Sequence, residues 1–331
     1  MSSPLSQISI IDFQPFFESD AAYRQAVAKQ IYQASQESGI MYLKNHGIPQ
    51  TLIDKVFNEA KSFFSLPLEI KQQLEQESTA WIKHVGRGYV GIGRLSADPT
   101  KLGDLREGFD VGKEVLLENW SQVKYTSEPL WIGNQPNKWP PGQDGFRQDI
   151  LDFFHISYET AFSVLRALAL ALQLPESFFV EKHDKKDGNL RLTHYPPLNQ
   201  LELQPEQTRL REHVDANTIT LLFQDEVGGL EVCTVQGEWI SVPWISGAII
   251  VNIGALMQRW TSDELYAPKH RVIIPNDLRS LQSRYFLGLF IVPNYLGSEI
   301  ECIESLQETE QSPKYPPITL EDYFISLNHS K

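Results

Sequence analysis

Hydrophobic and polar positions follow two different rhythms along the chain, and the change lies near residue 175. Before it, apolar residues recur at helical spacing, which predicts helices over 20–39, 50–64, 67–75 and 145–173. Two short β-prone runs, 5–12 and 40–48, accompany these helices. Between 79 and 145 the pattern loosens into Gly-, Pro- and aromatic-rich stretches, which are typical of lids and binding loops.

After residue 175 the chain has the texture of a β protein. Seven short β-rich runs are separated by turn residues: LRLTHYPP, NTITLLFQ, GLEVCTV, EWISVPW, AIIVNIG, HRVIIP and RYFLGLFIVP. Short strands at regular spacing predict a sandwich or barrel. We therefore expect a mainly β protein with flanking α-helices, built as one domain over 1–331. Its predicted parts are a helical portion with lid loops (1–175), a barrel core (186–295) and a tail with a small helix (296–331).

Composition and charge narrow the possible functions. The chain has 41% hydrophobic residues, enough for a sizeable core, and a net charge of −13. An acidic balance argues against nucleic acid or an anionic membrane as partner, because phosphate binding needs a basic surface. Cys233 and Cys302 form no CxxC pair, so neither a disulfide framework nor a Cys-rich zinc site is expected. With no signal peptide and no apolar stretch long enough for a bilayer, we expect a cytoplasmic protein.

A histidine and an aspartate stand two residues apart, at His213 and Asp215, directly before the run NTITLLFQ. A polar loop that enters a strand would explain them. In extended backbone, however, residues i and i+2 point the same way, so the imidazole and the carboxylate would face one point. His270 opens another β-rich run and offers a third ligand. Two histidines and one carboxylate on one face of a metal are typical of non-haem Fe(II) oxygenases, although a zinc hydrolase could use the same three residues.

An arginine at the start of an apolar strand supports the oxygenase hypothesis. Arg284 begins RYFLGLFIVP, and an inward guanidinium is costly unless a carboxylate meets it. That carboxylate could belong to a protein acid or, next to an open metal site, to a cosubstrate. In LRLTHYPP, alternation places Arg191, Thr193 and Tyr195 on one face of the strand. If this face points inward, Tyr195 also reaches the cosubstrate.

Motifs that match one enzyme family run through most of the chain: IIDF, GIMYLKNHGI, RGYVGIG, LREGFD, NKWP, YPP, HVDANTITLLFQDEVGGLEV, VNIGALMQRWT, KHRVIIP and RYFLGLFIVPN. With them the chain resembles the isopenicillin-N-synthase-like branch of the 2-oxoglutarate/Fe(II)-dependent dioxygenases. The resemblance implies a double-stranded β-helix, or jelly roll, with N-terminal helices packed on it. It implies His213, Asp215 and His270 as iron ligands, and 2-oxoglutarate and O2 as cosubstrates. It also implies that Arg284 pairs with the distal carboxylate of 2-oxoglutarate, close to Tyr195.

Two positions depart from the family pattern. Where Arg-x-Ser is usual, the chain has Arg284, Tyr285 and Phe286, so a hydroxyl is missing. A hydrogen bond to a charged group is worth roughly 1.5–3 kcal/mol, so its loss weakens cosubstrate binding about ten- to a hundredfold unless it is replaced. Thr193, Tyr195 or a water could substitute. Ala255 stands where an acid is more usual, and we expect it to touch no ligand.

The resemblance implies a function: decarboxylation of 2-oxoglutarate coupled to oxidation of a small molecule, with hydroxylation as the default outcome. Desaturation and ring closure use the same ligands. The candidate substrate residues lie in the loops and on one strand: Arg87, Tyr89, Arg94, Arg106, Phe109 and Arg191. The loop arginines, Arg87, Arg94 and Arg106, either meet an anionic or amino-acid-like substrate or are surface residues that pair with acids such as Glu107 and Asp110.

Two rival hypotheses remain at this point. One is an Fe(II) oxidase of the same fold that does not use 2-oxoglutarate, and Phe286 is its support. The other is a catalytically silent jelly-roll binding protein. The retained histidines, aspartate and inward arginine argue against it, because a retired site has no physical reason to keep a buried charge.

Overall fold

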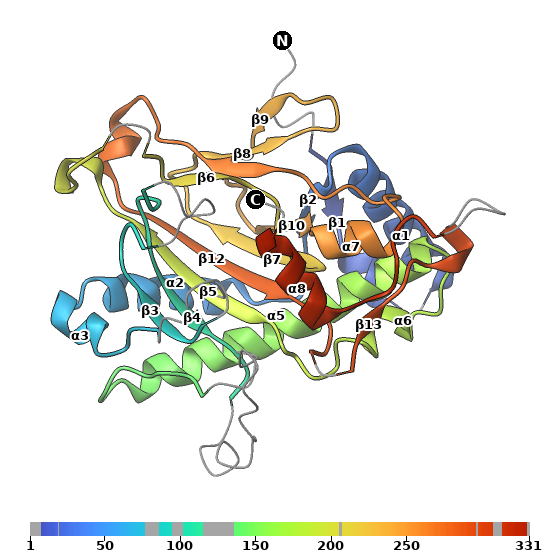
Figure 1. Cartoon of the computed structure of the whole chain (residues 1–331), viewed down its shortest axis with the longest axis horizontal. Helices are drawn as coiled ribbons and strands as arrows, with labels where there is room; N and C mark the ends of the chain where they lie inside the picture. The colour runs from blue at the N-terminus through green and yellow to red at the C-terminus, as the bar shows by residue number, and fades with distance from the viewer. Residues whose placement is uncertain are drawn as a thin grey trace.

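Two β-sheets pack face to face, with helices on the outer side of the larger sheet (Figure 1). The computed structural model describes residues 8–18, 20–76, 86–94, 102–114, 136–204, 207–295, 297–306 and 313–329. The larger sheet has the order β1 (Ile10–Asp12), β2 (Ile40–Lys44), β10 (Ala248–Ile253), β7 (Ile219–Gln224), β12 (Arg284–Ile291), β5 (Asn189–Tyr195), β4 (Glu107–Val111), β3 (Gly88–Val90). The smaller sheet has the order β6 (Leu210–His213), β11 (His270–Val272), β8 (Leu230–Cys233), β9 (Trp239–Ser241).

Five helices lie where the sequence predicts them: α1 (Ala21–Glu37), α2 (Gln50–Phe64), α3 (Leu68–Gln72), α5 (Asp144–Ala171) and α8 (Leu320–His329). The short helices α6 (Ser177–Val180) and α7 (Ala255–Trp260) were not predicted. α1 begins after Asp20, whose carboxylate accepts hydrogen bonds from the free N–H groups of the first turn. α5 runs beneath the large sheet in Figure 1 and packs against α1 and α2. Among the described residues, no helix is long and apolar enough to cross a bilayer.

All seven predicted β runs form strands, β5 and β7 to β12, and the jelly-roll fold is confirmed. The predicted division at residue 175 is not a division of the sheet. β1 and β2 extend one edge of the large sheet. The region that was interpreted as lid loops supplies β4, which pairs with β5, and β3 beyond it. Such short strands with Gly and charged residues carry a weak periodic signal, so the sequence pattern did not reveal them.

The register of β5 decides which side chains face the space between the sheets. Tyr195, Thr193 and Arg191 lie opposite Arg284, Phe286 and Gly288 of β12. Tyr195 packs into the apolar cluster between the two sheets, together with Leu210 and Val272 of the smaller sheet. Leu190 and Leu192 point the other way, into the core shared with α5. The predicted alternation along LRLTHYPP is therefore confirmed, and its polar face points inward.

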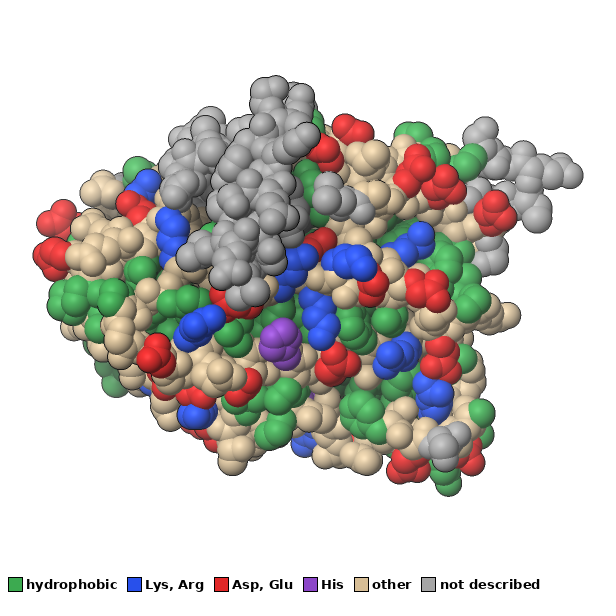
Figure 2. Space-filling model, turned by 90° about the horizontal axis from the view of Figure 1, so that it is seen from below, with side chains coloured by type: hydrophobic (Ala, Val, Ile, Leu, Met, Phe, Trp, Pro, Cys, Tyr) green, Lys and Arg blue, Asp and Glu red, His purple; other side chains and the backbone are tan. Residues whose placement is uncertain are grey.

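The outer surface shows mixed charge. On the face drawn in Figure 2, basic and acidic side chains lie interspersed between apolar and uncharged residues. The described residues on this face form no continuous basic surface of the kind that a nucleic acid requires.

Candidate metal centre and anion pocket

The three candidate metal ligands converge because two strands of the smaller sheet bring them together. His213 is the last residue of β6 and lies directly opposite His270, the first residue of β11. Their ring centroids are 4.2 Å apart. Oδ1 of Asp215 lies 3.7 Å from His213 Nε2 and 3.5 Å from His270 Nε2. Ligand atoms bonded to one cation at about 2.1 Å are about 3 Å from one another, so these residues fit one metal ion.

Hydrogen bonds behind each ligand fix its orientation. His213 Nδ1 lies 2.9 Å from the Arg211 carbonyl, and His270 Nδ1 lies 3.3 Å from the Pro268 carbonyl. Each carbonyl oxygen accepts a hydrogen bond from the Nδ1–H group, so each Nε2 presents a lone pair to the common point. Oδ2 of Asp215 accepts hydrogen bonds from Thr220 Oγ1 (2.6 Å) and Asn252 Nδ2 (2.9 Å), which leaves Oδ1 for a metal.

The electrostatics of the three residues favour a cation. Although burial opposes it, the imidazoles of His270 and His213 and the hydrogen bond from Thr220 lower the pKa of the Asp215 carboxyl below its usual range. Burial, and then the neighbouring His270, lower the pKa of His213 to about 3. An ionised aspartate and a neutral histidine are the states that metal binding requires. Despite burial, Asp215 raises the pKa of His270, which shows the negative potential at this point.

Ala255 contacts a ligand residue, contrary to expectation. Its backbone N–H donates to the Asp215 carbonyl at 2.7 Å, at the start of α7. This contact uses the main chain, so it explains the position of α7 but not the identity of the side chain.

Arg284 lies fully buried next to Tyr195 and has an unused donor. Its Nε donates to the Gly228 carbonyl (2.8 Å) and its Nη2 to Gln224 Oε1 (3.2 Å). Its Nη1 has no hydrogen-bond partner in the described part of the chain. The guanidinium carbon lies 4.9 Å from the centre of the Tyr195 ring. No ion pair joins Arg284 to a carboxylate of the described residues, so the salt-bridge alternative is not supported and an external anion fits the site.

Thr193 and Phe286 occupy the next row of the inward face. They lie opposite each other on β5 and β12. The Thr193 hydroxyl is buried and makes no hydrogen bond to any described residue. Its position next to the phenyl ring supports its predicted role as a replacement for the missing hydroxyl, although that role remains a prediction.

Arg106 extends the same polar face at the edge of the barrel. Because Glu107 pairs with His194, Arg106 lies opposite Tyr195. Its Nε is buried without a hydrogen-bond partner among the described residues and is 3.9 Å from Asp104. Its charge is a minor contribution that acts to lower the pKa of both candidate ligand histidines. The pKa of His213 is lowered mainly by burial, and despite burial that of His270 is raised overall by Asp215.

Arg191, buried on β5, is paired with an acid of the protein. Its Nε and Nη2 donate to the two carboxylate oxygens of Asp110, each at 2.7 Å. Glu107, the other acid considered as a partner for the loop arginines, instead accepts from Lys71, Tyr89 and His194.

The remaining candidate substrate residues pack in the core or interact with other groups of the protein. Phe109 and Tyr89 belong to the core on the helix side of the large sheet, so the expectation that they contact substrate is wrong. Phe109 alternates with Gly108 and Asp110 along β4, which is why it faces away. Arg87 is buried and donates to Asn189, and Arg94 pairs with Glu75 at the surface. Their positions give no support for a substrate contact.

Arg209 is a further buried arginine, which was not among the residues predicted from the sequence. Arg209 precedes β6, is 0% exposed and lies close enough to Arg284 that this charge, after burial, lowers its pKa. Its position four residues before His213 in TRLREHVD was the signal that could have revealed it. Its polar neighbours suggested instead that it lies on the surface.

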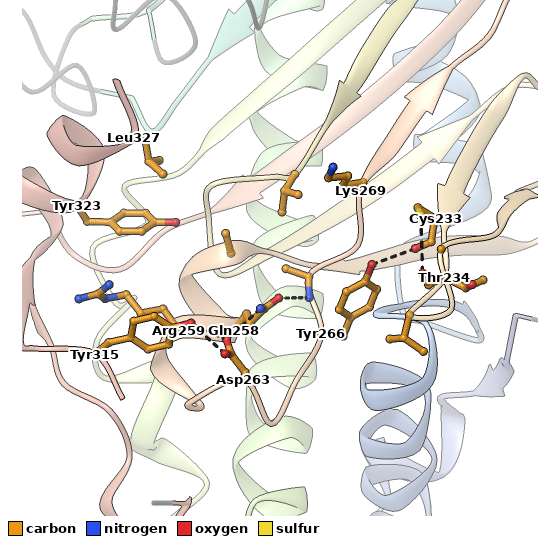
Figure 3. A pocket seen from close by; sticks show the side chains of 15 residues that line it. Cys233, Thr234, Gln258, Arg259, Asp263, Tyr266, Lys269, Tyr315, Tyr323 and Leu327 are labelled. Atoms are coloured by element: carbon orange, nitrogen blue, oxygen red, sulfur yellow. Dashed lines mark hydrogen bonds between the residues drawn. The ribbon is translucent and has the colours of Figure 1, made fainter. Parts of the chain in front are cut away.

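A separate cleft lies on the outer side of the metal-binding segments (Figure 3). It has a volume of about 550 Å³ and is lined by residues of β8, α7 and α8, among others. Val214 and Lys269, the chain neighbours of the candidate ligands, line it, whereas His213, Asp215 and His270 do not. The Tyr266 hydroxyl donates to the Cys233 carbonyl across one wall. The cleft is therefore not the metal centre.

A jelly roll that brings two histidines, one aspartate and a buried arginine together defines a class of non-haem iron oxygenases. Comparison with known families agrees. The profile described as the N-terminal part of the non-haem dioxygenase in morphine synthesis matches residues 8–142. The profile of the 2OG-Fe(II) oxygenase superfamily matches residues 186–293. The chain belongs to the 2OG-Fe(II) oxygenase superfamily and is a 2-oxoglutarate- and Fe(II)-dependent dioxygenase.

Relatives of known name cover nearly the whole chain. The 2-oxoglutarate-Fe(II) type oxidoreductase hxnY of Emericella nidulans is 32% identical over 321 residues, 95% of this chain and 87% of that protein. The proline hydroxylase buaE of Petromyces alliaceus is 32% identical, over 93% of this chain and 94% of that protein. A full-length Neurospora crassa protein crystallised with alpha-ketoglutarate and thymine is 32% identical, with a TM-score of 0.82 over 98% of this chain and 97% of that one.

Proposed function

We propose that His213, Asp215 and His270 hold the iron and that Arg284 binds the far carboxylate of 2-oxoglutarate. The observation that carries this proposal is the triad itself: three ligand atoms within 4.8 Å of one another, each oriented by a hydrogen bond behind it. The unused Nη1 of Arg284 supports the second part. Fe(II), O2 and 2-oxoglutarate supply the oxidising chemistry when bound, with release of CO2 and succinate.

The protein contributes position and a water-poor environment. Tyr195 packs its ring against the Arg284 guanidinium and holds it in the apolar cluster between the sheets. Charge-assisted hydrogen bonds are stronger there than in water. A dicarboxylate held at Arg284 would have a fixed direction toward the metal, and this restraint lowers the entropy cost of the reaction.

The substrate that fits the remaining polar groups is a small anion, such as a carboxylic acid or an amino acid, and its simplest oxidation is hydroxylation. Arg106 supports this class, because its buried Nε is unused by the described residues and lies on the same face as Tyr195. Gly108, between Arg106 and Asp110 on that face, lies opposite Thr193 and carries no side chain there. The similarity to a proline hydroxylase is consistent with an amino-acid-like substrate.

A neutral heterocycle is a second candidate. The Arg191 charge is paired with Asp110, so this part of the inward face does not itself require an anion. A structurally similar Neurospora crassa protein was crystallised with thymine, a neutral heterocycle.

A screen for substrate-stimulated succinate release separates these possibilities. The panel contains carboxylic acids and amino acids, the methyl ester or amide of each, and thymine-like heterocycles. For an anionic substrate, we expect the acid to stimulate turnover and its ester to fail. Arg106→Met should raise the KM for that acid about ten- to a hundredfold, the value of one hydrogen bond to a charged group. Equal rates with acid and ester would contradict the anionic class.

A further inference from the structure

Two buried guanidiniums, those of Arg209 and Arg284, lie near enough to influence each other's charge, although the proposed function uses only one. Arg209 lies immediately before β6, and its Nη2 donates to the Gln282 carbonyl at 3.2 Å. Its Nε and Nη1 are buried and make no hydrogen bond with any described residue. Arg284 stands two residues after Gln282, and both arginines are 0% exposed. Together they have three buried nitrogens without a hydrogen-bond partner among the described residues: Arg209 Nε, Arg209 Nη1 and Arg284 Nη1.

No described carboxylate neutralises this pair by direct contact. Asp225 is the carboxylate that acts on this pair electrostatically: its charge favours the protonated form of Arg209, and the charge of Arg284 favours the ionised form of Asp225. Its own oxygens, however, accept from the backbone N–H groups of Tyr285 (2.5 Å) and Val227 (3.1 Å). Two like charges buried without a hydrogen-bonded anion are costly. An anion that binds between them would relieve both the repulsion and the unused donors.

Phe286 provides no hydrogen-bond donor beside Arg284, so a second donor for a bound carboxylate must come from another residue. The Phe286 ring lies 5.8 Å from the Arg284 guanidinium carbon and can donate no hydrogen bond. Arg209 precedes β6 of the smaller sheet, whereas Arg284 belongs to β12 of the larger one, and the charge of Arg284 acts on Arg209. Arg209 therefore offers hydrogen-bond donors from the β6 side, where Phe286 on β12 offers none.

We propose that Arg209 binds the far carboxylate of 2-oxoglutarate together with Arg284 and thereby replaces the hydroxyl that Phe286 removes. This inference rests on the proposed function of Arg284. It makes Arg209 a residue that selects a 2-oxo acid with a second carboxylate over one without it.

The experiment compares two ligands on the Fe(II)-loaded protein under anaerobic conditions by calorimetry. 2-Oxoglutarate has the far carboxylate, and 2-oxovalerate has the same chain length but ends in a methyl group. Arg209→Met should weaken 2-oxoglutarate about ten- to a hundredfold and leave 2-oxovalerate within about threefold, because only the former meets the guanidinium. Arg209→Lys should fall in between, since an ammonium keeps the charge but loses the planar fork. Arg147→Met is the matched control: this exposed arginine lies on α5 and pairs with Glu114.

The outcomes distinguish the inference from the function on which it rests. If the unaltered protein fails to bind 2-oxoglutarate, the proposed function is wrong. If it binds 2-oxoglutarate and Arg209→Met weakens both ligands equally, or neither, Arg209 is structural and this inference is wrong. Arg209→Gln provides the test if the Met variant does not fold, because its amide can still donate to the Gln282 carbonyl. A thermal melt confirms that each variant is folded before the affinities are compared.

Discussion

The hydrogen bond from Thr220 to Asp215 offers a precise test of how the metal centre is held. Thr220→Val replaces the hydroxyl with a methyl group of nearly the same volume and removes the 2.6 Å bond to Oδ2. The bond from Asn252 Nδ2 to the same oxygen, at 2.9 Å, remains. The carboxylate is then held by one hydrogen bond instead of two, so its plane can rotate away from the two imidazoles.

The expected size of the effect follows from the kind of bond lost. A hydrogen bond to a charged group contributes roughly 1.5–3 kcal/mol, which corresponds to about a ten- to hundredfold change in an equilibrium constant. Loss of a partner behind a metal ligand has effects of the same order on metal affinity. We therefore expect Thr220→Val to weaken Fe(II) or Mn(II) binding about ten- to a hundredfold, while 2-oxoglutarate affinity at saturating metal changes much less.

The assay is an anaerobic competition titration between the protein and a metal-sensitive chelating dye. Thr160→Val is the matched control, because Thr160 is also buried and donates one hydrogen bond, to the His46 carbonyl, far from the triad. It should bind metal like the unaltered protein. Metal affinity of Thr220→Val within twofold of the control would refute the idea that Thr220 orients the ligand.

Three further perturbations have defined outcomes. Arg284→Met should reduce 2-oxoglutarate affinity at least a hundredfold in calorimetry while metal affinity stays unchanged, and unchanged 2-oxoglutarate binding would refute the assigned role. Lys71→Met leaves the buried Glu107 without the ammonium at 2.8 Å and should cost about 2–4 kcal/mol in urea unfolding, without changing metal affinity. Burial lowers the pKa of His183 to about 4, so its stabilising contribution is full above the unfolded value of about 6.5 and is lost as pH falls toward 4. Between pH 8 and 5, the free energy of unfolding of the unaltered protein should therefore fall by about 2 kcal/mol more than that of His183→Gln. Parallel pH profiles of the two free energies would contradict this.

The sequence predicted the β-core well because its strands carry strong local signals. β7, β10 and β12 are runs of branched and aromatic residues between turn residues, and α2 was predicted with its observed limits, 50–64. β4 was missed because Glu107, Gly108 and Asp110 are poor strand formers, and the strand exists through its pairing with β5. Tertiary context therefore determined this element.

The candidate site was predictable where it followed local alternation or a family motif. Strand periodicity alone predicts that Arg191, Thr193 and Tyr195 share one face, whereas the packing of Tyr195 between the sheets shows that this face points inward. The direct pairing of His213 with His270 does not, because strand partners separated by more than fifty residues are set by the fold. The same limit explains Arg209 and the Asp110–Arg191 pair: which buried charge meets which partner depends on distances that no single strand encodes.

The central claim is that one iron ion and one 2-oxoglutarate bind at the centre formed by His213, Asp215 and His270. An anaerobic titration of the protein with Fe(II) and then 2-oxoglutarate, followed by the metal-to-ligand charge-transfer absorption, tests it most directly. We predict that the band grows to saturation at one equivalent of each, and that His270→Ala removes it while the protein remains folded. A full-strength band in His270→Ala, or its absence in the unaltered protein, would contradict the account.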